Sequence, residues 1–387
     1  MSLISFRTAH EVRPLGDGRS VVGSNTAGIG HYVQDPDHHL QKLNKILNGT
    51  LNQQEATEQI AKQTGISPFN AHTLLEKLIQ LGHIEAISQP NLTPEQQTRF
   101  SRSTALYSWL GGFGKFDRWA PQEIICSSSI CILGAGGIGS SIALQMTASG
   151  IGKITLVDFD TVELSNLNRQ IAYSEKSIGK LKTDELKNRI RELNSDCSVR
   201  TIERKIEGVE ELIPIFKEVD LVIRAIDNPP ESAYWVSEAA IATKTPWIDC
   251  SYAGPMAVCA TFVPGTTGCY RCLRESEKQR LQQNNISGLY EETPLGINAA
   301  IAPIVSIASA LASLEALRFL VSRTNLSMGK VLHQNLADYS NQYSIEVPRV
   351  LFLGICLDFY YCLRRVLVPK FGFHFDRGSV SQALVKP

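Results

Sequence analysis

The residues best suited to chemistry lie close together in one segment of the chain. Asn166, Arg169 and Gln170 fall within the run DFDTVELSNLNRQ (residues 158–170), and Lys182 follows shortly afterwards. Phosphoryl and nucleotidyl transfer need cationic and polar groups around a polyphosphate, because negative charge builds up on the phosphate oxygens as the leaving group departs. Hydride transfer to a nicotinamide has no use for such a gathering of cations. The segment therefore favours chemistry on a nucleoside triphosphate.

A glycine cluster ahead of this segment predicts a phosphate-binding loop. It separates a predicted strand at residues 130–133 from a predicted helix at residues 140–149, and its members are Gly134, Gly136, Gly137 and Gly139. Glycines allow a tight turn and close backbone approach to a phosphate, which then faces the free N–H groups of a helix N-terminus. A second predicted strand at residues 154–157 ends at Asp158, about 20 residues on, where an acidic side chain usually accepts the ribose hydroxyls. These features indicate a nucleotide, and NAD fits them as well as ATP.

Lys182 opens a further predicted helix, in which Leu186, Ile190 and Leu193 recur at helical spacing. The helix dipole disfavours a cation at this end by roughly a few tenths of a kcal/mol. A nearby bound anion would offset that cost, whereas the alternative is an ordinary solvated lysine. The presence of Asn166 and Arg169 in the preceding loop favours the anion.

The stretch from about residue 99 to residue 343 resembles the ThiF/MoeB family, the bacterial relatives of the ubiquitin-activating enzymes. The run at residues 158–170 and the sequence AIDN at residues 225–228 carry most of the resemblance. Members of this family adenylate a carboxylate with ATP and Mg²⁺. The resemblance implies a phosphate loop at the four glycines, a ribose contact at Asp158 and a Mg²⁺ ligand at Asp227. It also implies triphosphate contacts from Asn166, Arg169, Gln170 and Lys182.

A further catalytic residue is implied by the segment Arg99-Phe-Ser-Arg102. It resembles the family's RYSRQ sequence, whose second arginine reaches across a dimer into the partner's ATP site. Arg102 is therefore expected to act in trans, beside Arg169, Lys182 and Asp227, and the protein is expected to be a homodimer. The alternative for Arg102 is a surface ion pair.

Composition and charge limit the function classes. The 387 residues are 43% hydrophobic and 20% charged, which is ordinary for a soluble protein with room for two domains. Lys plus Arg equals Asp plus Glu at 38 each, which argues against a nucleic-acid partner. The apolar run within residues 350–368 is shorter than the about 20 residues of a membrane span, so no membrane partner is expected. Nine cysteines without a secretion signal indicate a reducing, cytoplasmic location.

Residues 1–90 are expected to form a separate small domain. A hairpin or short sheet is expected at residues 12–33, and it is followed by helical patterns at residues 37–47, 52–64 and 67–81 and by a returning strand in LGHIEAI. Helix, turn, helix and wing is the outline of a nucleic-acid reader. However, residues 40–90 hold four lysines and four glutamates, whereas a phosphate backbone attracts clustered cations.

Two other roles remain for this domain, a structural cap and peptide recognition by strand addition or in a groove. The family resemblance favours the peptide. In peptide-modifying members, a winged-helix clamp ahead of the ThiF-like domain holds a ribosomally made precursor peptide. We therefore expect such a peptide as the partner.

Cys269 and Cys272 form a C-x-x-C pair that suits half of a tetrahedral Zn²⁺ site. Family members complete the site with a second C-x-x-C near the C-terminus, which this chain lacks, since Cys356 and Cys362 are more widely spaced. Structural zinc, a redox-active pair and a merely buried pair stay open. The polar segment 273–298 resembles the family's crossover loop above the adenylate, and its lack of cysteine disfavours thioester transfer.

The remaining elements are expected to extend the sheet. Residues 220–226 form an apolar strand that is interrupted by Arg224, which is either a buried pair partner or a residue facing the substrate. Magnesium ligands belong at the carboxyl end of such a strand, where Asp227 follows. Further strands are expected at residues 246–250 and 257–263, and a small-residue helix at residues 299–321 is expected to pack in the core or in a dimer interface.

These observations predict an α/β fold, with a mostly parallel Rossmann-like sheet, helices on both faces, and a winged-helix-like domain in front. The expected domains are a peptide clamp (1–90), an ATP-binding adenylation domain (91–345) and a C-terminal apolar segment and tail (346–387). The expected activity is ATP- and Mg²⁺-dependent adenylation of carboxylates on a precursor peptide. PaaA-like members activate glutamate side chains for dehydrative condensation in pantocin-type antibiotic biosynthesis, and that is the favoured fate of the adenylate.

Four alternatives accompany this prediction. One is MccB-like nucleotidylation of a peptide C-terminus, and another is ThiF/MoeB-type activation of a carrier protein for sulfur transfer. The other two belong to different classes, a NAD-dependent oxidoreductase and a non-catalytic peptide-binding module. The cationic segment around Arg169 argues against both of the latter.

Overall fold

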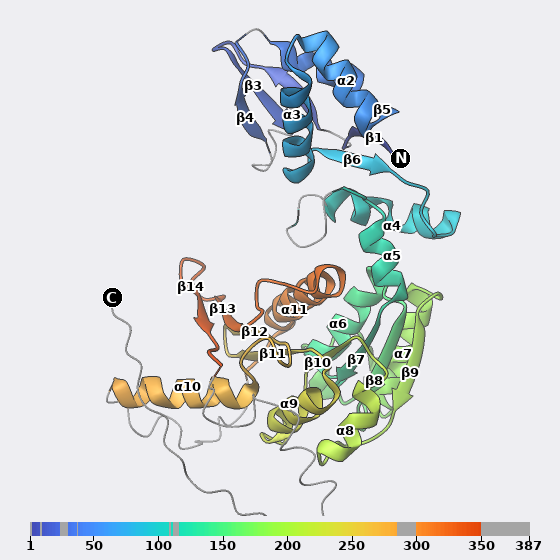
Figure 1. Cartoon of the computed structure of the whole chain (residues 1–387). Helices are drawn as coiled ribbons and strands as arrows, with labels where there is room; N and C mark the ends of the chain where they lie inside the picture. The colour runs from blue at the N-terminus through green and yellow to red at the C-terminus, as the bar shows by residue number, and fades with distance from the viewer. Residues whose placement is uncertain are drawn as a thin grey trace, which may run out of the picture.

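A computed structural model describes residues 2–7, 10–23, 30–36, 38–107, 110, 116–284 and 299–349 of the chain. Its largest feature is an eight-stranded sheet of order β14-β13-β12-β11-β10-β7-β8-β9 (Figure 1). The five strands from β11 to β9 run parallel, and β12, β13 and β14 extend the sheet in antiparallel fashion. The strands are β7 (Ser129–Leu133), β8 (Lys153–Val157), β9 (Ser198–Ile202), β10 (Leu221–Arg224), β11 (Trp247–Ala253), β12 (Met256–Phe262), β13 (Lys330–Asn335) and β14 (Gln342–Glu346).

Helices cover both faces of this sheet, as the apolar parallel strands require. Alternate strand residues point to opposite faces, so Ile130 and Ile132 join one hydrophobic cluster and Cys131 and Leu133 join the other. Helices α6 (Gly137–Ala148), α7 (Lys182–Leu193) and α11 (Ala302–Ser322) contribute to the first cluster, and helices α8 (Val209–Phe216), α9 (Ser232–Thr243) and α10 (Tyr270–Gln283) contribute to the second. The predicted fold class is confirmed.

Helix α11 lies in the core, as its small residues predict. Among the described residues it is the one helix long and apolar enough to cross a membrane, but half of that apolar window is buried inside the protein. It packs against α6 and β11, and the Ser309 hydroxyl donates a hydrogen bond to the Ile138 carbonyl at 3.3 Å. The helix therefore serves as a core element that supports the start of α6.

The N-terminal region contains two small sheets and a helical pair. The sheets have the orders β5-β1-β6 and β2-β3-β4, and their strands are β1 (Leu3–Phe6), β2 (Glu11–Pro14), β3 (Arg19–Gly23), β4 (His31–Gln34), β5 (Asn48–Asn52) and β6 (Ile84–Ile87). The helical elements are η2 (His39–Lys42), α1 (Leu43–Ile46), α2 (Gln53–Thr64) and α3 (Pro68–Gln80). A third hydrophobic cluster joins them around Ile60 and Leu75. The expected helix, turn, helix and wing are all present, followed by α4 (Pro94–Tyr107) and α5 (Ala120–Ser127).

The structure bears on two expectations about the C-terminal half of the chain. The first part of the predicted crossover loop is helical, since α10 continues to Gln283, and residues 285–298 lie outside the described residues. Residues 350–387 also lie outside them, with the apolar C-terminal segment, Cys356 and Cys362.

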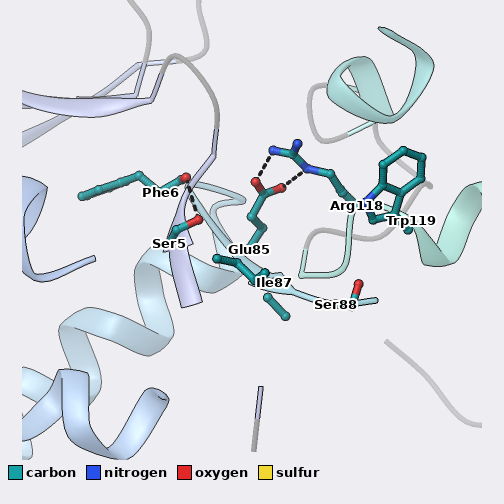
Figure 2. A pocket seen from close by; sticks show the side chains of 8 residues that line it. Ser5, Phe6, Glu85, Ile87, Ser88, Arg118 and Trp119 are labelled. Atoms are coloured by element: carbon teal, nitrogen blue, oxygen red, sulfur yellow. Dashed lines mark hydrogen bonds and ion pairs between the residues drawn. The ribbon is translucent and has the colours of Figure 1, made fainter. Parts of the chain in front are cut away.

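A buried ion cluster joins the N-terminal region to the segment before α5. The Glu85 carboxylate on β6 accepts hydrogen bonds from the Nε and Nη2 atoms of Arg118 (Figure 2), and the Arg7 Nη1 lies 3.5 Å from the same carboxylate. The Ala86 N–H also donates to the Phe116 carbonyl at 2.6 Å. Beside this junction, β1, β6 and Trp119 line a cavity of about 320 Å³.

Helix α2 offers a test of the N-terminal fold. The Asn52 side chain accepts hydrogen bonds from the N–H groups of Gln54 and Glu55, and the Glu55 carboxylate accepts from the Asn52 N–H. We expect Asn52→Ala to lower the free energy of unfolding by about 1 kcal/mol, because two helix N–H groups lose their acceptor, and Asn52→Asp to keep it. Denaturant unfolding followed by circular dichroism measures this, and equal stabilities of the two variants would contradict it.

Candidate nucleotide-binding site

The glycine loop joins β7 to α6 at the carboxyl edge of the parallel strands. Gly134 has φ of 95°, and a Cβ on it would meet the Ala225 carbonyl oxygen at 2.5 Å. A Cβ on Gly139 would lie 1.8 Å from the Gly134 carbonyl oxygen, so helix and turn can approach each other only because residue 139 is glycine. Gly136 is the N-cap of α6, and the nearest atom to a Cβ there is the Gln170 Nε2 at 3.9 Å. The space beside Gly136, at the N-terminus of α6, is thus open, as the approach of a phosphate to the helix N–H groups requires.

Asp158 and Tyr173 hold this loop in place. The Asp158 carboxylate accepts the Ala135 N–H at 2.6 Å and the Asp160 N–H at 2.8 Å. The buried Tyr173 hydroxyl lies 2.7 Å from the Ala135 carbonyl and 3.3 Å from the Lys182 carbonyl. Burial raises the pKa of Tyr173, and the charge of Asp158 raises it further, so the phenol stays a neutral donor. Asp158 therefore positions the loop, and its carboxylate retains lone pairs for the predicted ribose contact.

The predicted triphosphate contacts of residues 166–170 lie against the loop. A Cβ on Gly137 would lie 3.5 Å from the Arg169 carbonyl oxygen and 3.7 Å from its Cγ. Gln170 is buried, and its Oε1 has no hydrogen-bond partner within the described part of the chain. Asn166, in the short helix η3 (Leu164–Asn166), uses its amide oxygen to accept the Glu163 N–H at 3.1 Å. Arg169 and Gln170 thus face the loop, whereas Asn166 shapes the turn that carries them.

Lys182 begins α7 with its side chain only 8% exposed. The Lys182 ammonium group lies 2.8 Å from the Asp160 carboxylate, and the Lys182 backbone N–H donates a hydrogen bond to the Asp160 carbonyl at 3.0 Å. The anion that offsets the unfavourable helix position is therefore, in this structure, a side chain of the protein. Because Asp160 is about half exposed, the pair lies at the surface, next to the loop that Asp158 anchors.

Asp227 follows the end of β10, next to the glycine loop. Its carboxylate accepts no hydrogen bond within the described residues and is open to solvent on one side. The surrounding protein partly shields the Asp227 carboxylate from water, which raises its pKa. The positive charge of Arg224 opposes this rise, and the negative charge of Asp249 adds to it. An unpartnered carboxylate at this edge fits Mg²⁺, which usually binds one or two carboxylates together with substrate phosphates.

Tyr252 links Asp227 to the cationic segment. Burial raises the pKa of the Tyr252 phenol, Asp227 adds to the rise, and Arg169 lowers it. Arg169 itself donates to the Ser165 carbonyl and the Asn168 side-chain oxygen, both at 3.0 Å. The predicted triphosphate and Mg²⁺ residues are therefore close enough to act on one another electrostatically.

Arg102 and the cysteine pair lie apart from this cluster. Arg102 is exposed on α4 and makes no ion pair with any described residue. Cys269 and Cys272 are buried at the start of α10 with their sulfurs 3.5 Å apart, near the about 3.8 Å between two thiolates on one Zn²⁺. No group of three metal-ligating side chains occurs within the described residues, so the zinc site stays a prediction.

Three contributors to the site were not expected from the sequence. Tyr173 and Tyr252 reach the site from segments that contain no recognisable motif. Asp249 forms an ion pair with Arg224 at 2.7 Å. Of the two roles expected for Arg224, the structure therefore shows the buried pair partner. In the sequence, the one sign of this role was that Asp249 is a charged residue in the otherwise apolar predicted strand WIDC.

Comparison with known proteins agrees with this geometry. The sequence profile described as the ThiF family matches residues 107–349, which is more than half of the chain. The chain belongs to the ThiF family.

Curated relatives include the adenylyltransferase and sulfurtransferase MOCS3 of Dictyostelium discoideum, 34% identical over 204 residues, or 52% of this chain and 45% of the relative. The sulfur carrier protein ThiS adenylyltransferase of Escherichia coli (strain K12) is 29% identical over 202 residues, or 51% of this chain and 74% of the relative. The chain thus spans about half the length of the first of these ThiF-family relatives. The predicted family resemblance is confirmed.

Solved structures extend the likeness to the N-terminal region. E. coli MccB with ATP has a TM-score of 0.72 and 23% identity, and the match covers 91% of this chain and 99% of MccB. MccB with MccA gives a TM-score of 0.71 at 23% identity over 92% of this chain and 100% of MccB. PaaA gives a TM-score of 0.63 at 20% identity over 88% of this chain and 99% of PaaA. These matches establish a shared fold across nearly the whole chain.

The glycine loop gives a prediction that separates folding from binding. We expect Gly139→Ala to destabilise the protein by about 3 kcal/mol, because its methyl group would overlap the Gly134 carbonyl. Gly136→Ala should cost only about 0.5–1 kcal/mol, the difference between glycine and alanine at a helix N-cap, because its methyl group has room in the fold. It should weaken ATP binding, because the methyl group would stand where a phosphate approaches. Thermal unfolding and calorimetric titration with ATP measure the two effects. Equal loss of stability in both variants would disprove the assignment.

Proposed function

We propose that this protein adenylates carboxylate groups of a ribosomally made precursor peptide, using ATP and Mg²⁺. The observation that carries the proposal is the packing of Arg169 and Gln170 against the glycine loop, with Lys182 and Asp227 beside it. Cations and polar groups gathered at the end of a parallel sheet suit a bound triphosphate. The fold shared with ATP-bound MccB supports the same nucleotide.

The proposed reaction is an in-line attack of a carboxylate oxygen on the α-phosphorus of ATP. A P–O bond to the substrate forms as the bond to pyrophosphate breaks, and the products are an acyl-adenylate and pyrophosphate. The N–H groups at the start of α6 hold the phosphates, while Arg169 and Lys182 stabilise the charge on the departing group. Magnesium held by Asp227 would neutralise further phosphate charge.

A peptide is the substrate that the N-terminal region fits best. Its two small sheets present edge strands, to which an extended peptide can add as a further strand. The four lysines and four glutamates of residues 40–90 leave it without the cation cluster that a nucleic acid would need. The structure of MccB with MccA supports a peptide partner by likeness of fold.

The adenylate is proposed to be consumed by condensation within the peptide, as activated glutamate side chains would allow. Residues 273–298 contain no cysteine, which removes the thiol that a thioester route would use in that segment. The alternative of carrier-protein activation for sulfur transfer is favoured by the names of the curated relatives. MccB-like nucleotidylation of a peptide C-terminus is the third outcome.

Mass spectrometry distinguishes these fates. Incubation with magnesium-ATP and a peptide encoded beside the gene should give a product lighter by one water, because condensation expels the hydroxyl oxygen of the activated acid as AMP. A peptide heavier by a nucleotidyl group would support nucleotidylation. Activity on a sulfur carrier protein alone would contradict the proposal.

Arg169→Ala and Lys182→Ala should each lower ATP–pyrophosphate exchange by about a hundred- to thousandfold, because each removes a cation that stabilises the leaving group. Lys180→Ala is the matched control, since its ammonium group lies 3.2 Å from Glu185 with a largely exposed side chain. Exchange is measured with labelled pyrophosphate. Near-normal exchange in either site variant would remove that residue's role.

Arg102 is proposed to complete the partner's site in a homodimer. Arg102→Ala and Asp227→Ala should each be inactive alone. Mixed and allowed to exchange subunits, they should recover about a quarter of the wild-type exchange rate, because half of the dimers then hold one intact site of two. A mixture as inactive as its components would show that Arg102 does not act across subunits.

A further inference from the structure

Arg224 is an unusual residue for its place in the fold. It ends the buried strand β10, whose other residues are apolar, and it is only 9% exposed. Its Nη1 lies 2.7 Å from the Asp249 carboxylate on the neighbouring strand β11, and its Nη2 donates to the Ser232 hydroxyl at 3.1 Å. These three residues, the Arg224 brace, connect two strands of the sheet to the start of α9.

Stability alone does not account for the brace. Removing two charges from water costs several kcal/mol per ion, and apolar residues of similar volume are often as stable as a buried pair or more so. In addition, the Arg224 Nε is buried and has no hydrogen-bond partner among the described residues. A buried donor left without a partner adds to the cost. The reason for the brace must therefore lie in the part of the structure that it holds in place.

The brace closes the loop that carries Asp227. This loop, residues 225–231, leaves the sheet at Arg224 and returns to helix at Ser232, so the Arg224 side chain joins the two ends of the loop. The loop also borders the phosphate site, because Ala225 and Ile226 pack against Gly134. Its start is further fixed by a hydrogen bond from the Ala225 N–H to the Leu133 carbonyl at 2.8 Å. Asp227 is thus an exposed residue of a loop whose two ends are held by contacts with the sheet, the glycine turn and each other.

We propose that Arg224 is a positioning residue, which holds the Asp227 loop so that its carboxylate meets the magnesium ion of a bound magnesium-nucleotide. The inference rests on the proposed function only in taking Asp227 as the ligand of that cation. Groups that orient a metal ligand are typically worth about ten- to a hundredfold in metal affinity. Asp249 serves in the same way, by fixing the guanidinium from the neighbouring strand.

The test uses the double variant Arg224→Met/Asp249→Asn, which removes both charges at nearly constant volume and leaves neither uncompensated. Calorimetry with a non-hydrolysable ATP analogue, in Mg²⁺ and in EDTA, measures the affinity gained from the metal. We expect the affinity in Mg²⁺ to fall about tenfold and the affinity in EDTA to stay unchanged. Ser232→Ala, which removes one contact and no charge, should shift the affinity in the same direction by less. Ser232→Ala also tests the inference, through the same affinities, if the double variant does not fold.

The control is Arg318→Met/Glu315→Gln, which removes another buried ion pair, of 2.7 Å, within α11. It should leave both affinities unchanged. Wild-type affinity for the magnesium-nucleotide in both brace variants would overturn the inference, and so would a wild-type protein whose affinity does not respond to Mg²⁺. A lowered magnesium-nucleotide affinity in the brace variants, in a protein whose wild type shows no pyrophosphate exchange, would instead refute the proposed function while supporting the brace.

Discussion

The contact between the Gly134 carbonyl and the backbone of Gly139 is the constraint on which the site depends. With no side chain between them, α6 can begin almost against the end of β7, and its first N–H groups face the edge of the sheet. Every other part of the site is arranged around this turn. Asp158 and Tyr173 hold it from one side through Ala135, and Ala225 closes it from the other. The helix dipole then adds a fixed positive potential that requires no reorganisation when phosphate binds.

Charge in the site is balanced locally in this structure. The Lys182 ammonium lies against Asp160, the Arg224 guanidinium against Asp249, and Arg169 is held by neutral oxygens of its own loop. Arg169 therefore has no carboxylate partner among the described residues, and its charge is available to an anionic ligand. This arrangement explains how several cations can gather in a small space without destabilising the fold. Arg169 is thus directly available to a bound phosphate, Lys182 would exchange Asp160 for one, and Arg224 supports a loop.

The sequence predicted best those features that depend on neighbouring residues. The glycine loop, the strands around it and the capped helices of the N-terminal region all follow from local spacing and turn chemistry. Pairings such as Arg224 with Asp249 depend on the register between two strands that a helix separates in the sequence, so only the folded sheet shows them. Helix α10 is an instructive miss. Its run RCLRESEKQRLQQ is rich in helix formers, and that local propensity outweighs the resemblance to a crossover loop on which the prediction was based.

The junction at Glu85 shows how the two parts of the chain can act together. The Glu85 carboxylate pairs with both Arg7 and Arg118, and it has little freedom to change partners because it and Arg7 are buried and breaking a buried ion pair is costly. The strand that carries Glu85 is an edge strand of the N-terminal sheet, and Arg118 lies just before α5, which contacts α11. Helix α11 in turn packs on α6, the helix of the phosphate loop. A chain of packed elements therefore connects the proposed peptide-holding region to the proposed nucleotide site.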